Sequence, residues 1–316
     1  MLVAVLAAGI ALYITAHIAL IILSPKPMTP TAEEKTFLSA SSPTKPQPLP
    51  SLSDPASVQL SVVVPAYNES TRLPPMLRTT LAHLASVRPA RTYEVLIVDD
   101  GSSDSTSAVA LTLASAHPKE DIRVVRLRRN RGKGAAVKHG FLHARGERIL
   151  MVDADGASRF EDLEKLWEEM DKIEKDGQGV VVGSRAHLVG TEAVVKRSLV
   201  RNILMHGFHF LLRTFGVGHI RDTQCGFKLF TRTTSQSLFP SLHITNWIFD
   251  VELLLLARML RVPVAEVPVA WEEVAGSKIR LLWDSLGMLT DLIVIRGNYA
   301  LGRWRPVSVG AGKKVD

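Results

Sequence analysis

Cysteine is almost absent from this chain of 316 residues, since Cys225 is the only one. A disulfide framework, a cysteine-based zinc cluster and a CxxC redox site are therefore excluded. Aromatic residues are few as well, at 6%. Hydrophobic residues still make up 46% of the chain and charged residues 22%, which excludes wholesale disorder. The single cysteine is also typical of a chain that lives in reducing cytosol.

Acidic residues are outnumbered, with 31 Asp and Glu against 38 Lys and Arg, so the net charge is +7. Residues 1–57 contain three lysines and three acidic residues, and the whole excess therefore lies beyond Ser57. A basic body favours anionic partners, namely nucleic acid, a membrane surface or phosphorylated substrates.

Charge is missing altogether from residues 1–23, which contain no Asp, Glu, Lys or Arg. A membrane span needs about 20 apolar residues, so this segment is long enough. A cleaved signal peptide is the alternative, but the segment lacks a basic start and its apolar run exceeds the usual length of about 7–15 residues. We expect a retained transmembrane anchor. Lys26, Lys35 and Lys45 follow it, which favours a body on the cytoplasmic side.

Residues 24–57 hold eight of the 17 prolines together with many Ser and Thr. Such a composition buries little apolar surface, and it predicts an extended linker that does not fold.

From Gln59 onward, short apolar strands alternate with helical stretches. Strands are expected at residues 61–65, 94–100, 122–127, 148–155 and 179–185. This alternation predicts an α/β fold with a mostly parallel sheet that is covered by helices on both faces. Ligands of such sheets bind beyond the carboxyl ends of the strands, so the polar residues that end each strand are the candidates for a site.

Two of these strands end in paired carboxylates. Asp99 and Asp100 close the second strand, and they are costly to bury unless a cation or hydrogen-bond donors face them. Asp153 and Asp155 close the fourth, where alternate carboxylates can converge on one hard cation once the chain bends. Mg²⁺ needs only one or two carboxylates when substrate phosphates supply its other ligands. The second pair therefore predicts a metal site.

A basic run at residues 126–140 places Gly132, Lys133 and Gly134 just before a predicted helix. A helix start with nearby cations suits a phosphate group, and we count Lys133 among the substrate-binding candidates. The spacing of a Walker A motif is absent, and so is GxGxxG after the first strand. A solvated basic face is the alternative for the arginines of the run. Nucleic acid is not an expected partner, because no aromatic residues interleave with these charges.

Four motifs occur in the order of the predicted strands: PxYNE at 65–69, DDGSxD at 99–104, DxD at 153–155 and GSR at 183–185. Together they resemble the inverting nucleotide-sugar glycosyltransferases of the GT-A fold. Further segments are similar to the polyprenyl-phosphate branch and, within it, to the dolichyl-phosphate β-glucosyltransferase family. These segments are Lys196–Ser198, Arg221–Lys228, Trp247–Asp250, Trp271–Glu273 and Gly276–Lys278. The resemblance covers residues 58–280, and the QxxRW motif of processive synthases is missing.

The resemblance implies transfer of glucose from UDP-glucose to dolichyl phosphate with inversion, for lipid-linked oligosaccharide assembly in protein N-glycosylation. It also implies a location at the endoplasmic reticulum membrane, with the catalytic domain facing the cytosol. Two alternatives stay open, a dolichyl-phosphate mannose synthase that uses GDP-mannose and an inactive nucleotide-sugar-binding scaffold. Protein partners are not indicated.

Carried over by motif, the resemblance assigns roles to individual residues. It implies that the uridine end of the donor is bound by Pro65, Tyr67, Glu69, Asp99 and Asp100. It implies that Asp153 and Asp155 hold Mg²⁺ or Mn²⁺, which makes Asp155 a catalytic residue.

The acceptor is an anionic phosphate, so we expect cations rather than a strong catalytic base around it. Arg185, Arg201 and Lys278 are the expected cations. Asp222 is expected to orient the donor sugar or a cation.

The C-terminal segment, residues 276–316, is predicted to be amphipathic and close to the membrane, after a catalytic domain at 58–275. Residues 281–301 are strongly apolar but contain Asp284, Asp291 and Arg296, which makes a full span costly. Either a core-packing helix or a helix in the headgroup region fits this pattern, and a basic tail follows. A second apolar face is expected between Leu199 and Leu212.

Overall fold

The computed structural model describes residues 1–188, 220–274 and 281–307. Their strands form a nine-stranded sheet in the order β2-β1-β5-β4-β3-β6-β8-β7-β9. The strands are β1 (Thr36–Ser39), β2 (Ser42–Pro48), β3 (Val58–Ala66), β4 (Tyr93–Asp99), β5 (Ile122–Arg126), β6 (Gly146–Val152), β7 (Val180–Ser184), β8 (Phe227–Thr231) and β9 (Val264–Pro268).

Most neighbouring strands in the centre of the sheet run parallel. β3 pairs in parallel with β4 and β6, β4 with β5, and β7 with β9. β8 runs antiparallel to both β6 and β7, so β6 and β7 point the same way. The carboxyl ends of β3, β4, β6 and β7 therefore meet at one edge of the sheet, which we call the carboxyl edge.

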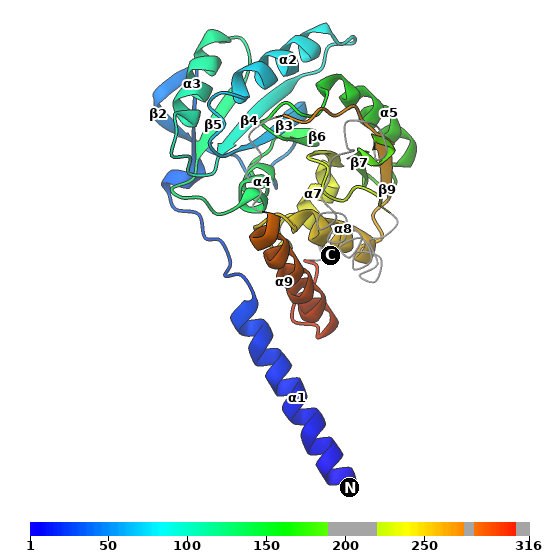
Figure 1. Cartoon of the computed structure of the whole chain (residues 1–316). Helices are drawn as coiled ribbons and strands as arrows, with labels where there is room; N and C mark the ends of the chain where they lie inside the picture. The colour runs from blue at the N-terminus through cyan, green and yellow to red at the C-terminus, as the bar shows by residue number, and fades with distance from the viewer. Residues whose placement is uncertain (189–219, 275–280, 308–316) are drawn as a thin grey trace, which may run out of the picture.

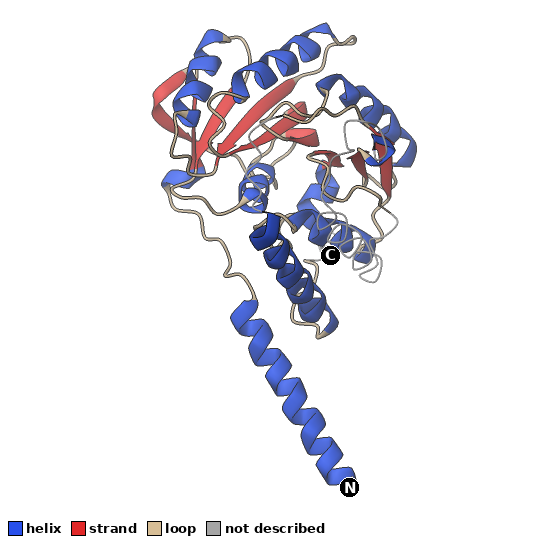
Figure 2. Cartoon of the chain, in the orientation of Figure 1, coloured by secondary structure: helices blue, strands red, loops and turns tan. Residues whose placement is uncertain are grey.

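Helices cover both faces of the sheet (Figure 2). One face carries α2 (Leu73–Ser86), α3 (Thr106–Ala116) and α5 (Leu163–Ile173), and the other carries α4 (Lys133–Leu142), α7 (Arg232–Leu238) and α8 (Phe249–Met259). Within β3, Val62 and Val64 pack in the core on the face that carries α2, α3 and α5, while Val63 packs in the core on the opposite face. Because both faces are buried, the strands are continuously apolar rather than alternating. The predicted fold class is confirmed.

The segment between the first helix and β3 differs from the expectation. We predicted an unfolded linker over residues 24–57, but residues 33–48 form a short helix, η1 (Glu33–Lys35), and the hairpin β1–β2. The hairpin joins the sheet through antiparallel pairing of Leu38 with Val124 of β5. An edge strand gains its order from backbone hydrogen bonds and can therefore fold without the apolar run that marks a central strand. The linker prediction is wrong for this central part.

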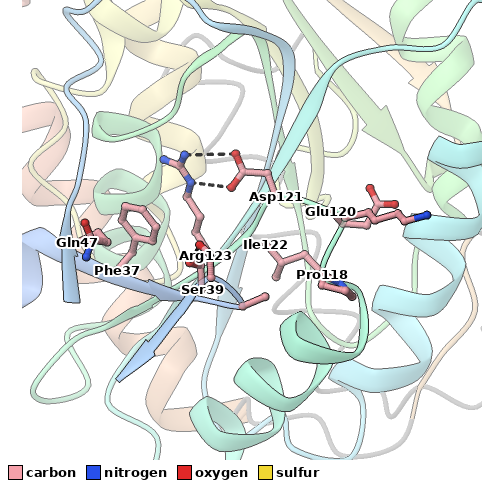
Figure 3. A pocket seen from close by; sticks show the side chains of 11 residues that line it. Phe37, Ser39, Gln47, Pro118, Glu120, Asp121, Ile122 and Arg123 are labelled. Carbon is pink, nitrogen blue, oxygen red and sulfur yellow. Dashed lines mark hydrogen bonds and ion pairs between the residues drawn. The ribbon is translucent and has the colours of Figure 1, made fainter. Parts of the chain in front are cut away.

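A shallow hollow of about 300 Å³ lies between this hairpin and the loop at residues 118–123 (Figure 3). Arg123 donates from Nε to Asp121 at 2.9 Å, and its guanidinium lies 4.5 Å from the centre of the Phe37 ring. The hollow adjoins the amino end of β5 and therefore lies away from the carboxyl edge.

Helix α1 (Leu2–Leu23) extends away from the rest of the chain (Figure 1). It is long and apolar enough to cross a membrane, and only 6% of its apolar window is buried. Its last turns meet α9 (Leu281–Ala300). Ser24 accepts a hydrogen bond from the side chain of Asn298 at 2.9 Å, and the backbone of Gly297 approaches Leu20 so closely that a Cβ there would fall 2.8 Å from it.

Helix α9 is both a core helix and an exposed one. Leu292, Val294 and Ile295 are buried in the core cluster that includes α8. Leu286 and Ile293 lie on another side and are 58% and 54% exposed. The second apolar face expected between Leu199 and Leu212 lies outside the described residues.

Candidate functional site

The four sequence motifs lie at the carboxyl edge of the sheet. Pro65 is buried near the end of β3, and Asp99 is the last residue of β4. Asp153 directly follows β6, and Arg185 directly follows β7. Residues that lie up to 120 positions apart in the sequence are thus brought to one edge by the parallel topology.

The loops after β3 and β4 are interlocked. Asn68 has a positive φ of 54°, and its side-chain oxygen accepts the backbone N–H of Ser103 at 2.8 Å. The backbone N–H of Glu69 donates to Thr106 at 2.7 Å, and its carboxylate forms an ion pair with Arg72 at 2.6 Å. Glu69 therefore fixes the loop in this structure. Tyr67, between these contacts and β3, is half-buried.

Asp99 and Asp100 are both buried, with 4% and 2% of their surface exposed. Asp99 accepts the backbone N–H of Ser102 at 2.9 Å and the hydroxyl of Ser107. Asp100 accepts the backbone N–H groups of Arg131 and Gly132 at 2.8 and 2.9 Å. Burial, with a smaller contribution from Asp99, raises the pKa of Asp100 to about 7. These carboxylates are satisfied by donors of the chain itself.

Asp153 and Asp155 are half-buried, and a cation faces them. The Nζ of Lys133, at the start of α4, lies 2.6 Å from Oδ1 of Asp153 and 2.9 Å from Oδ2. Burial acts against the charged lysine, but Asp153 and the neighbouring acids raise the pKa of Lys133 above its usual value. Burial and repulsion by Asp153 raise the pKa of Asp155, although the backbone N–H of Ala157 donates to it at 3.0 Å.

This pair fits a divalent cation. The two carboxylates supply hard oxygen ligands. Burial, and after it repulsion by Asp153, raises the pKa of Asp155, and a bound cation would favour the charged carboxylate again. The described residues contain no group of three or more His, Cys, Asp or Glu that could hold a metal on its own. Mg²⁺ is commonly held by one or two carboxylates together with substrate phosphates, so the residues present are sufficient for an ion shared with a diphosphate.

Gly226 is a part of the site that the sequence patterns did not single out. A Cβ at this position would fall 1.9 Å from Oδ2 of Asp153, so any other residue would displace this carboxylate from its present position. The backbone oxygen of Gly226 also accepts the N–H of Asp153 at 3.2 Å. Gly226 lies in the 221–228 segment quoted above, and the signal that could have found it is a glycine directly before a buried strand.

Arg185 and Asp222, which were predicted as separate site residues, form one pair. The guanidinium donates twice to the carboxylate, from Nε at 2.7 Å and from Nη2 at 2.8 Å. The backbone N–H of Arg185 donates to the same carboxylate at 2.9 Å. Burial opposes the charged guanidinium, but the bonds to Asp222 raise the pKa of Arg185 further above its normal range. Trp271, whose ring centre lies 5.4 Å from this guanidinium, borders the pair.

A second pair, Lys228 with Asp250, is almost fully buried behind the site. The Nζ of Lys228 lies 2.7 Å from Oδ1 of Asp250 and 2.6 Å from the backbone oxygen of Cys225. Burial raises the pKa of Asp250 above its usual value, and burial also raises the pKa of the Cys225 thiol to about 11. Both charged residues lie in segments that carried the resemblance, but no role had been assigned to either.

Two predicted site residues, Arg201 and Lys278, lie outside the described residues. The structure therefore gives no geometry for these expected acceptor cations.

Comparisons with known proteins show the family of this chain. The sequence profile described as glycosyl transferase family 2 matches residues 61–239. The chain belongs to this family. Among curated relatives, the dolichyl-phosphate β-glucosyltransferase of Drosophila melanogaster is 49% identical, covering 89% of this chain and 87% of the relative. Proteins of the same name from Homo sapiens and Saccharomyces cerevisiae are 47% and 43% identical and cover 86% and 94% of this chain. They cover 85% and 93% of the relatives themselves.

Solved structures of the same fold are more distant. Glucosyl-3-phosphoglycerate synthase from Mycobacterium tuberculosis, in complex with UDP, superposes with a TM-score of 0.53 at 18% identity. The superposition covers 76% of this chain and 81% of the synthase chain. This likeness shows the GT-A fold. The resemblance stated from the motifs is confirmed, and this family 2 protein is a glycosyltransferase.

Proposed function

We propose that this glycosyltransferase transfers glucose from UDP-glucose to dolichyl phosphate with inversion, which gives dolichyl β-glucosyl phosphate. The observation that carries the proposal is the identity of 43–49% to dolichyl-phosphate β-glucosyltransferases over 86–94% of the chain. The product would supply lipid-linked oligosaccharide assembly for N-glycosylation. The intact acid pair and its neighbouring lysine argue against an inactive scaffold.

Asp153 and Asp155 would hold Mg²⁺ or Mn²⁺ together with the donor diphosphate. A neighbour of the same fold (TM-score 0.51, 18% identity, covering 75% of this chain and 79% of its own) was solved with Mn²⁺ and UDP-glucose, which supports a divalent ion here. When bound, the ion would neutralise the charge on the departing UDP. Lys133 is placed to share that task, because its ammonium group already lies against Asp153.

The uridine end of the donor would lie against the loops after β3 and β4. Within this proposal, Glu69, Asp99 and Asp100 act mainly by shaping these loops, because their carboxylates bind groups of the chain itself. Pro65 and Tyr67 are the remaining residues proposed for the uridine end.

The acceptor phosphate is anionic at neutral pH and needs positioning more than deprotonation. Arg185, held in place by Asp222, is the described cation at the end of β7 and is proposed to face the phosphates. Arg201 and Lys278 are proposed to join it.

The lipid acceptor requires a membrane location. We propose that α1 anchors the protein in the endoplasmic reticulum membrane with the catalytic domain in the cytosol. The contacts of Leu20 and Ser24 with Gly297 and Asn298 place the end of α9 beside the end of the anchor. The exposed Leu286, Leu289 and Ile293 of α9 recur at helical spacing, and this side is proposed to lie in the headgroup region.

A donor panel tests the proposal. The full chain in detergent is given a short polyprenyl phosphate, Mg²⁺ and either UDP-glucose or GDP-mannose. We expect glucosyl transfer from UDP-glucose, loss of transfer after chelation with EDTA, and recovery when Mg²⁺ or Mn²⁺ is restored. Transfer from GDP-mannose alone would replace this function with that of a mannose synthase.

A further inference from the structure

Glu34 is a fully buried carboxylate in η1, between the anchor helix and the sheet. Its Oε1 accepts the backbone N–H of Arg128 at 3.0 Å, and its Oε2 accepts the backbone N–H of Thr31 at 2.8 Å. The guanidinium of Arg131 lies 3.1 Å from both oxygens. The backbone oxygen of Glu34 accepts a hydrogen bond from Nε2 of His139 on α4 at 2.7 Å. A buried charge is tolerated only when it is paired in this way.

The loop that Glu34 holds, residues 128–132, is part of the carboxyl edge. Its last two residues, Arg131 and Gly132, donate their backbone N–H groups to Asp100. A Cβ on Gly101 would fall 2.4 Å from the backbone of Arg129, so the loop is packed directly on the turn after β4. The next residue after the loop is Lys133, which reaches Asp153. The loop is therefore clamped between Glu34 on one side and Asp100 on the other.

Loss of the Glu34 carboxylate would change the site and not only the stability of the hairpin. Without Glu34, the guanidinium of Arg131 would lose both of its carboxylate contacts in a buried environment, where its Nε already lacks a partner among the described residues. The loop would then have to move to satisfy this charge. Such a movement displaces the two N–H groups at Asp100 and the start of α4, and with them Lys133.

We infer that Glu34 is a positioning residue for the nucleotide site, because it holds the 128–132 loop against Asp100 and so couples the segment that follows the anchor helix to the donor end. The inference rests on the proposed function in one respect, namely that the ligand at this edge is the nucleotide of the donor. It also means that the catalytic unit begins before η1 and not at residue 58, where the motifs begin.

The experiment uses the full chain in detergent micelles and three variants, Glu34→Gln, Glu34→Ala and the control Glu33→Gln. Glu33 is the neighbouring acid, but its side chain is 80% exposed and it lies 3.9 Å from Arg128. Glu34→Gln keeps the shape and one acceptor oxygen, so it can fold if Glu34→Ala does not. Melting temperatures of all variants are recorded. Trypsin cleavage and nucleotide affinity are then measured well below the lowest melting temperature.

The first measurement is the rate of limited trypsin cleavage after Arg128, Arg129 and Arg131, followed by mass spectrometry. It reports the order of the loop without any ligand. We expect cleavage at least about fivefold faster in the Glu34 variants and unchanged in Glu33→Gln, since only the Glu34 variants lose hydrogen bonds between a buried carboxylate and this loop. Equal rates in all variants overturn the inference, whatever the nucleotide proves to be.

The second measurement is the affinity for UDP and for GDP in the presence of Mn²⁺. For the nucleotide that the unaltered chain binds, we expect a loss of at least about tenfold in the Glu34 variants and none in Glu33→Gln. Faster cleavage with unchanged nucleotide affinity would make Glu34 merely structural and would overturn the inference. Preference of the unaltered chain for GDP would contradict the proposed donor while the same comparison, made with GDP, still decides the role of Glu34.

Discussion

Two pairs of carboxylates lie at the carboxyl edge, and their surroundings differ. Asp99 and Asp100 are buried and accept N–H and O–H groups from nearby loops. Asp153 and Asp155 are more exposed, and an ammonium group binds the first of them. In the first pair, the carboxylates hold neighbouring loops in place by accepting their hydrogen bonds. In the second, the ammonium group of Lys133 contacts Asp153 at the place that we propose for a metal and a diphosphate.

The comparison teaches that the position of an acid at a strand end does not decide its role. Both pairs stand at the carboxyl ends of apolar strands of one mostly parallel sheet. What separates them is the partner: fixed backbone donors build a turn, whereas an exchangeable cation leaves a site open to a ligand. The following four predictions test this distinction.

Loss of Asp155 has the largest expected effect. In Asp155→Asn we expect turnover to fall at least about 100-fold while the melting temperature stays close to that of the unaltered chain, because this carboxylate is proposed to bind metal and does not pack in the core. Glucosyl transfer and thermal unfolding are measured at saturating Mg²⁺, with the exposed acid variant Asp176→Asn as control. Turnover near that of the unaltered chain would remove Asp155 from the metal site.

The second prediction concerns Asp100 and the pH dependence of the stability of the folded chain. Its pKa is about 7 in the folded chain against 3.8 as the ordinary value, so between pH 4 and 7 the folded state keeps a proton that the unfolded state has lost. Stability therefore falls as pH rises through this window, by at most about 4 kcal/mol, and levels off above it. Denaturant unfolding from pH 4 to 8 measures the slope. Asp100→Asn should remove this component, and an identical pH profile in the variant would show that Asp100 is ionised throughout.

Lys133 provides the third test. If its ammonium group competes with a metal for Asp153, Lys133→Gln should bind Mn²⁺ roughly 3- to 10-fold more tightly in the absence of nucleotide. Lys138→Gln is the matched control, because Lys138 lies on the same helix but donates to the backbone oxygen of Leu242 at 2.6 Å. Electron paramagnetic resonance of free Mn²⁺ gives both affinities. Weaker binding by Lys133→Gln would mean that the lysine supports the metal instead of replacing it.

Asp99→Asn has the smallest expected effect. The amide can still accept the N–H of Ser102 but loses the charge that strengthens its bond from Ser107, so the free energy of unfolding should drop by about 1 kcal/mol. Urea unfolding measures this loss, and Mn²⁺ affinity should not change. A variant of unaltered stability that loses Mn²⁺ would place the metal at the first pair.

The sequence allowed the centre of the sheet to be predicted because its strands are fully buried. Runs such as those of β3, β4 and β6 are apolar on both faces, and this signal does not depend on distant contacts. The hairpin β1–β2 escaped prediction because an edge strand rich in Ser and Pro carries no such signal. Its order comes from pairing with β5, whose partner residues lie about 85 positions away in the chain.

The sequence allowed individual site residues to be predicted, but not the ion pairs that these residues form with one another. Strand-end position pointed to Asp153 and Arg185, whereas no spacing rule relates Arg185 to Asp222, which lie 37 residues apart. The same applies to Lys228 with Asp250 and to Glu34 with Arg131, because these ion pairs join elements that only the folded topology brings together.

Mn²⁺ binding in the presence of UDP tests the central distinction most directly. Electron paramagnetic resonance titrations would compare the full chain with its Asp153→Asn, Asp155→Asn and Asp99→Asn variants. We predict that the unaltered chain and Asp99→Asn bind Mn²⁺ with similar affinity, while the other two variants lose at least about tenfold. Undiminished binding by both Asp153→Asn and Asp155→Asn would contradict the assignment of the metal to the pair that follows β6.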